Sequence, residues 1–157
     1  MVALLSSPKG FGEVMQTVET WLEEEGFSYA QAKGTQAGNT LFNYVVTLPS
    51  GTKMNIFQPS NRKDSICVST ALSFSDKQLK TLRQKSKIER DEILSEMRYK
   101  LAPLDVEFRF ENGELTRRIV ILHPIYYDAL TKDRFFRALS AVHKAFNIAG
   151  WILTQSL

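Results

Sequence analysis

The stretch VILHPIYYDALTKDRFF (120–136) gathers the side chains best suited to acid–base chemistry into six consecutive positions. They are His123, Tyr126, Tyr127 and Asp128. A histidine oriented by a carboxylate can act as a general base, so His123 with Asp128 is a candidate pair. Such a site also needs a nucleophile in a known setting, and the chain has no G-x-S-x-G elbow. Histidine and tyrosine also bury well when their polar tips find partners, so we interpret 123–130 as a strand-to-helix corner.

The residues around this corner have structural explanations of their own. Pro124 cannot donate to a sheet ladder, which predicts that the preceding strand stops there. Thr131 is a suitable N-cap for a final helix, and Leu130 and Phe135 occupy the two positions of a hydrophobic staple. Asp133 then lies in the first turn, where the helix dipole favours negative charge. An enzyme centred on His123 remains the alternative to a corner.

The other residues with reactive or metal-binding side chains are few. The chain has two histidines and one cysteine, so neither H-E-x-x-H nor a paired-cysteine spacing can occur, and no metal site is expected. His143 falls on the flank of the last predicted helix, and Cys67 is expected to be a small buried or half-buried residue of a strand. Neither G-x-G-x-x-G nor G-x-x-x-x-G-K-[ST] is present, and no cofactor is expected.

A basic stretch, KQLKTLRQKSKIER (77–90), holds six basic residues against one acidic residue. On a continuous helix, four of them share one stripe beside the apolar face. They are Lys80, Arg83, Lys87 and Arg90. Phosphates could lie along such a stripe, which makes nucleic-acid binding the alternative function. No RNP, KH or helix-turn-helix motif accompanies the stretch, so we favour a solvated helix face.

An acidic run, Glu23-Glu24-Glu25, ends the first predicted helix. Three carboxylates at a helix C-terminus oppose the helix dipole. An exposed helix end that aids solubility explains them, and a sharper hypothesis is that they face the 77–90 stretch within the monomer or across a dimer.

Length and composition are those of one ordinary globular domain spanning 1–157. The chain is 43% hydrophobic and 24% charged, with a net charge of +3. A single cysteine excludes an internal disulfide and favours a reducing cytoplasm. The start MVALLSSPKG lacks the features of a signal peptide. The longest aliphatic run, 119–122, is far too short to span a membrane.

The first half of the chain predicts one helix followed by strands. Apolar residues recur at three- and four-residue steps through 11–25, and Gly26 suits the C′ position of that helix. Residues 27–32 are a weak strand candidate, whereas 40–48 alternate cleanly between apolar and other side chains. Pro49-Ser50-Gly51 predicts a turn into a second arm that begins at Met54, and a further strand covers 65–72.

The second half predicts helix, hairpin and helix. Capping-box patterns at Ser75 and Ser86 start a helix that ends by Ala102 and that can bend or restart near Ser86. Strands around 106–111 and 115–122 flank Asn112-Gly113, the preferred pair for a type I′ turn. The sequence therefore predicts an α+β fold, an antiparallel β-sheet with helices packed on it in the order α-β-β-β-α-β-β-α.

The phrases WLEEEGF, FNYVVTLPSG and ILHPIYYDALTKDRFF resemble those of small uncharacterised archaeal proteins, and the element order resembles the type III secretion chaperone-like fold. That resemblance covers nearly the whole chain and carries no catalytic residues with it. It implies a homodimer that holds partner polypeptides on an exposed sheet or groove. One difference is charge, since secretion chaperones are usually acidic and this chain is basic. The expectation is a non-enzymatic protein-binding module whose partners are a second copy and a further, unidentified protein.

Overall fold

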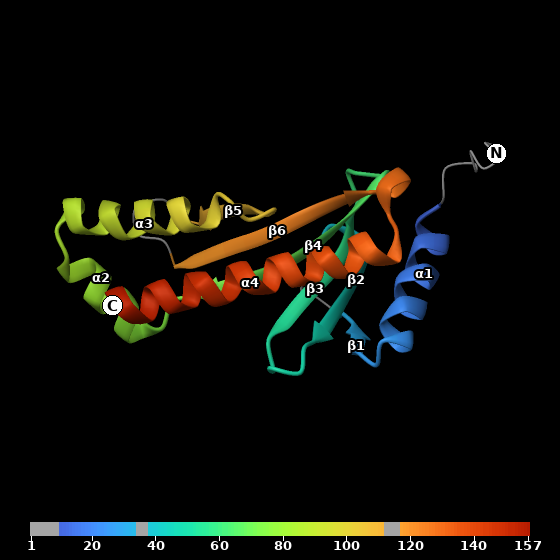
Figure 1. Cartoon of the computed structure of the whole chain (residues 1–157), viewed down its shortest axis with the longest axis horizontal. Helices are drawn as coiled ribbons and strands as arrows, with labels where there is room; N and C mark the ends of the chain where they lie inside the picture. The colour runs from blue at the N-terminus through green and yellow to red at the C-terminus, as the bar shows by residue number, and fades with distance from the viewer. Residues whose placement is uncertain (1–9, 34–37, 112–116) are drawn as a thin grey trace. The chain divides into compact units, whose positions relative to one another are not determined.

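The structure is a computed structural model that describes residues 10–33, 38–111 and 117–157 (Figure 1). The helices are α1 (Phe11–Glu24), α2 (Asp76–Gln84), α3 (Lys87–Leu101) and α4 (Lys132–Ser156). The strands are β1 (Ser28–Gln31), β2 (Thr40–Thr47), β3 (Lys53–Pro59), β4 (Ser65–Ser73), β5 (Glu107–Glu111) and β6 (Arg118–Tyr126). A 3₁₀ turn, Tyr127–Ala129, precedes α4.

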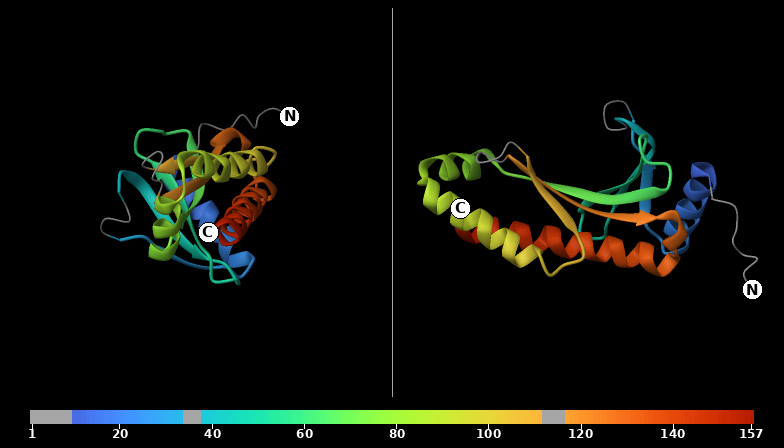
Figure 2. Two further views of the ribbon diagram at one scale, coloured as in Figure 1. Left: turned by 90° about the vertical axis from the view of Figure 1, so that its left-hand side faces the viewer. Right: turned by 90° about the horizontal axis from the view of Figure 1, so that it is seen from above.

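The strands form one antiparallel sheet in the order β1-β2-β3-β4-β6-β5, which confirms the predicted α+β class. Two details differ from the predicted element order. The weak candidate at 27–32 does form a strand, β1, because β2 pairs with all four of its residues. The helix expected from Ser75 to Ala102 is divided into α2 and α3, as Figures 1 and 2 both show.

The chain forms two compact units. The first unit contains Met1–Val68 and Pro124–Phe136, and the second contains Ser69–His123 and Arg137–Leu157. Three elements, β4, β6 and α4, each contribute residues to both units.

In the first unit, β2 and β3 give the sheet one buried face. On β2 and β3 the buried side chains alternate strictly, as the sequence pattern predicted. They are Phe42, Tyr44, Val46, Met54, Ile56 and Gln58. Helix α1 buries Val14, Val18 and Leu22, and the Tyr44 hydroxyl donates to Glu19 of α1, so α1 covers this face. Gly26 follows α1 with a φ of 72°, the left-handed conformation expected of a C′ glycine.

The start of α4 completes the core of the first unit. The amide of Arg134 donates to the Thr131 hydroxyl at 3.2 Å, so Thr131 is the predicted N-cap. The ring of Phe135 is fully buried, with its centroid 5.6 Å from that of Trp21 and 5.1 Å from that of Phe136. Phe136 stacks on Phe27 at 5.6 Å, which links the helix to the residue before β1.

In the second unit, β5 and β6 pair antiparallel from Glu107 opposite Leu122 to Glu111 opposite Arg118. The predicted turn at Asn112-Gly113 lies outside the described residues. Both capping boxes form: the Ser75 hydroxyl accepts from the Gln78 amide at 3.1 Å, and the Ser86 hydroxyl accepts from the Glu89 amide at 3.2 Å. Each box satisfies first-turn amides that would otherwise lack partners, which allows a new helix to begin at Lys87.

One prediction about β6 was wrong, because the strand does not stop at Pro124 but continues to Tyr126. The pairing of β6 with β5 ends at Leu122. Pro124 lies beyond that register, so its missing N–H removes no hydrogen bond to β5. Proline is therefore tolerated within this strand.

Candidate functional site

The corner after β6 is built around Tyr127. Its amide donates to the carbonyl oxygen of Asp64 at 2.7 Å, and its hydroxyl donates to the side-chain oxygen of Gln58. Gln58 is completely buried and donates its own amide to the carbonyl oxygen of Arg62. A buried amide needs such partners, since leaving it unpaired would be costly. Tyr127 and Gln58 thus hold the loop between β3 and β4 against the start of the corner.

Tyr126 holds the same loop from outside. Its hydroxyl accepts from the Arg62 guanidinium at 2.9 Å, and the guanidinium carbon lies 5.6 Å from the centroid of the Tyr126 ring. The ring is 47% exposed, and Asp128 in the following turn is also exposed. The contacts of both tyrosines are with the loop between β3 and β4, and they give the corner a structural role.

His123 belongs to the second unit, whereas Asp128 belongs to the first. The Nδ1 atom of His123 lies 2.6 Å from the carbonyl oxygen of Asp105 and 3.9 Å from its carboxylate. Because a carbonyl oxygen only accepts, Nδ1 carries the proton and a neutral ring keeps Nε2 as its acceptor. The partner that orients His123 is therefore the main chain of Asp105.

The basic residues do not form the stripe that a continuous helix would give. Lys80 and Arg83 lie on α2, and Lys87 and Arg90 lie on α3. The helices are separated at Lys85, whose ψ of 152° is extended. Arg90 is half-buried, and its guanidinium donates to the Lys85 carbonyl at 3.5 Å, while the other three side chains are exposed. The continuous helix on which a single stripe depended is therefore absent from 76–101.

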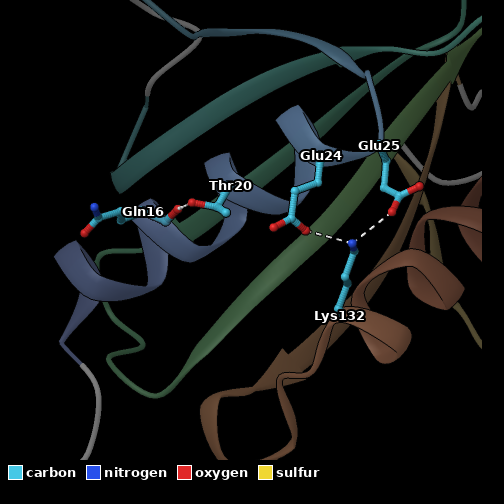
Figure 3. A network of polar contacts seen from close by, with 5 residues as sticks. All are labelled: Gln16, Thr20, Glu24, Glu25 and Lys132. Carbon is cyan, nitrogen blue, oxygen red and sulfur yellow. Dashed lines mark hydrogen bonds and ion pairs between the residues drawn. The ribbon is translucent and has the colours of Figure 1, made fainter.

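The acidic end of α1 forms ion pairs with a lysine at the start of α4 (Figure 3). The ammonium of Lys132 lies 2.7 Å from the Glu24 carboxylate and 2.9 Å from that of Glu25. The hydrogen bonds that the Lys132 ammonium donates, to Glu24 first and then to Glu25, raise the pKa of Lys132. All three groups are substantially exposed, so the pairs add little stability. Within one chain, these contacts take the place of the hypothesised contact between the acidic run and 77–90.

The sequence analysis missed two tyrosine–glutamate pairs on the α1 side of the sheet. Tyr44 donates to Glu19 and Tyr29 donates to Glu23, each at 2.5 Å. The two tyrosine rings meet edge to face at 5.7 Å. The glutamates are four residues apart on α1, and this spacing was the one indication of the pairs in the sequence. The tyrosines share a face only because Tyr29 pairs with Val46, two residues from Tyr44.

These pairs predict that alkaline pH destabilises the first unit. The hydrogen bond to Glu23 raises the pKa of Tyr29 to about 12, and burial together with Glu19 raises the pKa of Tyr44 well above its usual value. A phenol whose pKa is raised by folding stabilises the protein fully below the unfolded pKa of 10. That contribution is lost as pH rises through the folded pKa values. Urea titrations between pH 8 and 12 should show stability falling above pH 10, with a shallower fall in Tyr44→Phe. An equal slope in Tyr44→Phe would contradict this origin.

The remaining candidate residues, Cys67 and His143, are not grouped into a catalytic arrangement among the described residues. Cys67 is buried in β4, and His143 Nε2 lies 3.4 Å from the Asn147 amide on α4. An open hollow of about 290 Å³ between the end of α1 and the end of β2 is lined by Glu25, Gly26, Phe27, Ser28, Thr47, Leu48 and Pro49. Across the described residues, no three His, Cys, Asp or Glu side chains are grouped so that they could hold a metal ion. None of the helices formed by those residues is both long enough and apolar enough to cross a membrane.

Comparison with known proteins places the chain in a family. The family model described as "Uncharacterized conserved protein (DUF2299)" matches residues 14–153. No curated protein matches the chain. The crystal structure of an uncharacterized protein from Methanothermobacter thermautotrophicus is similar, with a TM-score of 0.80 and 27% sequence identity. The match covers 90% of this chain and 96% of the archaeal chain. The chain therefore belongs to the DUF2299 family of uncharacterized conserved proteins.

Proposed function

We propose that this protein is a non-enzymatic, homodimeric protein-binding module with a type III secretion chaperone-like fold. In this proposal, an extended polypeptide lies on the outer face of β1, β2 and β3, the face opposite α1. The observation that supports it is the contrast between the two faces. Alternate side chains of β2 and β3, from Phe42 and from Met54 on, are buried, whereas those between them are only half-buried or exposed.

The outer face combines apolar and amide side chains. Val45 and Phe57 are half-buried, and Leu41, the extra residue at the irregularity of β2, is 40% exposed. The side-chain amide of Asn55 donates to the side-chain oxygen of Asn43 at 3.0 Å. An asparagine side chain can make up to four hydrogen bonds, so this one bond does not exhaust the capacity of Asn55. Apolar contacts with a few amides suit an extended peptide better than a small polar substrate.

A peptide-display selection tests this proposal. Dodecapeptides selected on the immobilised protein should carry apolar residues at alternate positions, because an extended chain presents every second side chain to the face. A selected peptide, labelled and measured by fluorescence polarisation, should bind Phe57→Asp at least about tenfold more weakly. Phe11→Asp is the matched control, because Phe11 is an exposed phenylalanine on α1. Equal binding by the two variants, or no enrichment of peptides, would refute the outer face as the site.

Nucleic-acid binding is tested separately through the basic residues. Phosphate contacts release counterions, so such binding falls steeply with salt. With its four basic residues divided between two helices, the protein should show no sub-micromolar binding to RNA or DNA oligonucleotides at about 0.15 M salt. A gel-shift assay would measure this. Tight binding that disappears when Lys80, Arg83, Lys87 and Arg90 are replaced by glutamine would reverse the ranking of the two functions.

A further inference from the structure

Strand β5 ends the sheet in the second unit. The strand order terminates at β5, so among the described residues β6 is its one strand partner. An edge strand presents main-chain groups that another strand can pair with, and exposed edges commonly carry charges that discourage wrong pairing. The side chains of β5 indicate which kind of strand, and in which register, could pair with its free edge.

The sequence of β5, Glu-Phe-Arg-Phe-Glu (107–111), alternates charged and aromatic residues. Phe108 lies opposite Ile121 and Phe110 lies opposite Ile119, and both isoleucines are fully buried. The two phenylalanines share that apolar face, with ring centroids 5.9 Å apart, yet they are only half-buried. Strand β6 lies between β4 and β5, whereas no strand of the described residues lies beyond β5, so the phenylalanines are at the end of that face.

We infer that a second copy of the chain pairs antiparallel with β5, its two-fold axis passing at Phe108, so that Glu107 of each copy lies opposite Arg109 of the other. This inference deepens the proposed homodimer and rests on it. A two-fold axis places an antiparallel strand against its own sequence, so each possible axis gives a different set of opposed side chains. The charges along β5 distinguish these sets.

An axis at Arg109 is unfavourable, because it opposes arginine to arginine and Glu107 to Glu111. An axis at Phe110 would require Glu111 to pair with Arg109 of the other copy. Glu111 already accepts two hydrogen bonds from Arg118, at 3.0 and 2.9 Å, so it is engaged within its own chain.

An axis at Phe108 opposes charged residues that the Glu111–Arg118 contact does not engage. Glu107 and Arg109 are both exposed, and they would form two identical glutamate–arginine pairs on one face of the joined sheet. On the other face, Phe108 would meet Phe108 of the second copy, and Val106 would meet Phe110. Aromatic pairs across strands are favourable, and they cover the half-buried rings.

Charge reversal tests both the dimer and its register. The wild type should show a dimer by sedimentation equilibrium at micromolar to hundred-micromolar concentration. Glu107→Arg and Arg109→Glu should each weaken the dimer about tenfold or more, because each opposes two pairs of like charges. The double variant restores opposite charges across the axis at Phe108, so it should regain most of the wild-type affinity.

Each outcome separates the register from the proposed homodimer. A wild type that remains monomeric at every concentration would refute the homodimer and this inference together. A dimer unaffected by either reversal would refute pairing along β5 and leave the homodimer standing. Weakening in both single variants without recovery in the double variant would refute the axis at Phe108. Lys77→Glu, a reversal at an exposed residue of α2 in the same unit, is the matched control and should leave the dimer unchanged.

Discussion

Replacing Phe135 by alanine should lower the free energy of unfolding by about 3–5 kcal/mol, the usual cost of removing a buried aromatic ring. Phe135 is fully buried and contacts the rings of Trp21 and Phe136. Its removal deletes apolar burial and leaves a cavity that α1 and the start of α4 can fill only partly. Urea denaturation followed by circular dichroism would measure the loss.

The design has a local reporter and a matched control. The chain has two tryptophans, and Trp151 is 65% exposed, so Trp151→Phe leaves Trp21 as the single tryptophan beside the mutated ring. Phe11→Ala removes a phenylalanine that is 46% exposed and should change stability by less than about 1 kcal/mol. If Phe135→Ala lowered the free energy of unfolding no more than Phe11→Ala does, the ring of Phe135 would not be a main contributor to the core.

Replacing Tyr127 by phenylalanine should cost about 1–3 kcal/mol, although it removes one oxygen atom. The hydroxyl of Tyr127 donates to the side-chain oxygen of Gln58, which is completely buried. Without that donor, the oxygen keeps its desolvation penalty and loses its partner. Thermal and urea unfolding would measure the effect.

A double-mutant cycle shows whether the pair itself is responsible. Gln58→Met replaces the amide with an apolar side chain of similar length, and the double variant should cost less than the sum of the single variants. His123→Gln is the control, because the main contact of His123 is with Asp105, and it should cost less than about 1 kcal/mol. Strict additivity would show that the Tyr127 hydroxyl acts independently of Gln58. Loss of peptide binding by orders of magnitude in folded His123→Gln would restore the catalytic or binding interpretation of the corner.

Much of the architecture follows from local patterns that the sequence displays directly. The alternation of Phe42, Tyr44 and Val46 determines which face of β2 is buried, because side chains in a strand alternate between the two faces. The capping boxes at Ser75 and Ser86 form as predicted, since each involves residues only three positions apart. Glycine at position 26 and threonine at position 131 mark helix ends for the same local reason.

Prediction from the sequence failed where a residue distant in the chain determines the local structure. The strand continues through Pro124 because the register with β5 has already ended, which no local rule for proline contains. The division of the helix that carries the basic residues has a local cause instead, because the Ser86 box begins a new helix, an alternative that the pattern left open.

The sequence by itself determined the fold class, the helix ends and the buried faces, because these depend on residues a few positions apart. Tertiary structure alone paired Tyr127 with Gln58, Tyr44 with Glu19, and Lys132 with Glu24 and Glu25. Those residues are separated by 69, 25 and, for Lys132 and Glu24, 108 positions. Their contacts depend on strand register and on which distant segments of the chain lie side by side. Neither can be predicted from a short segment of the sequence.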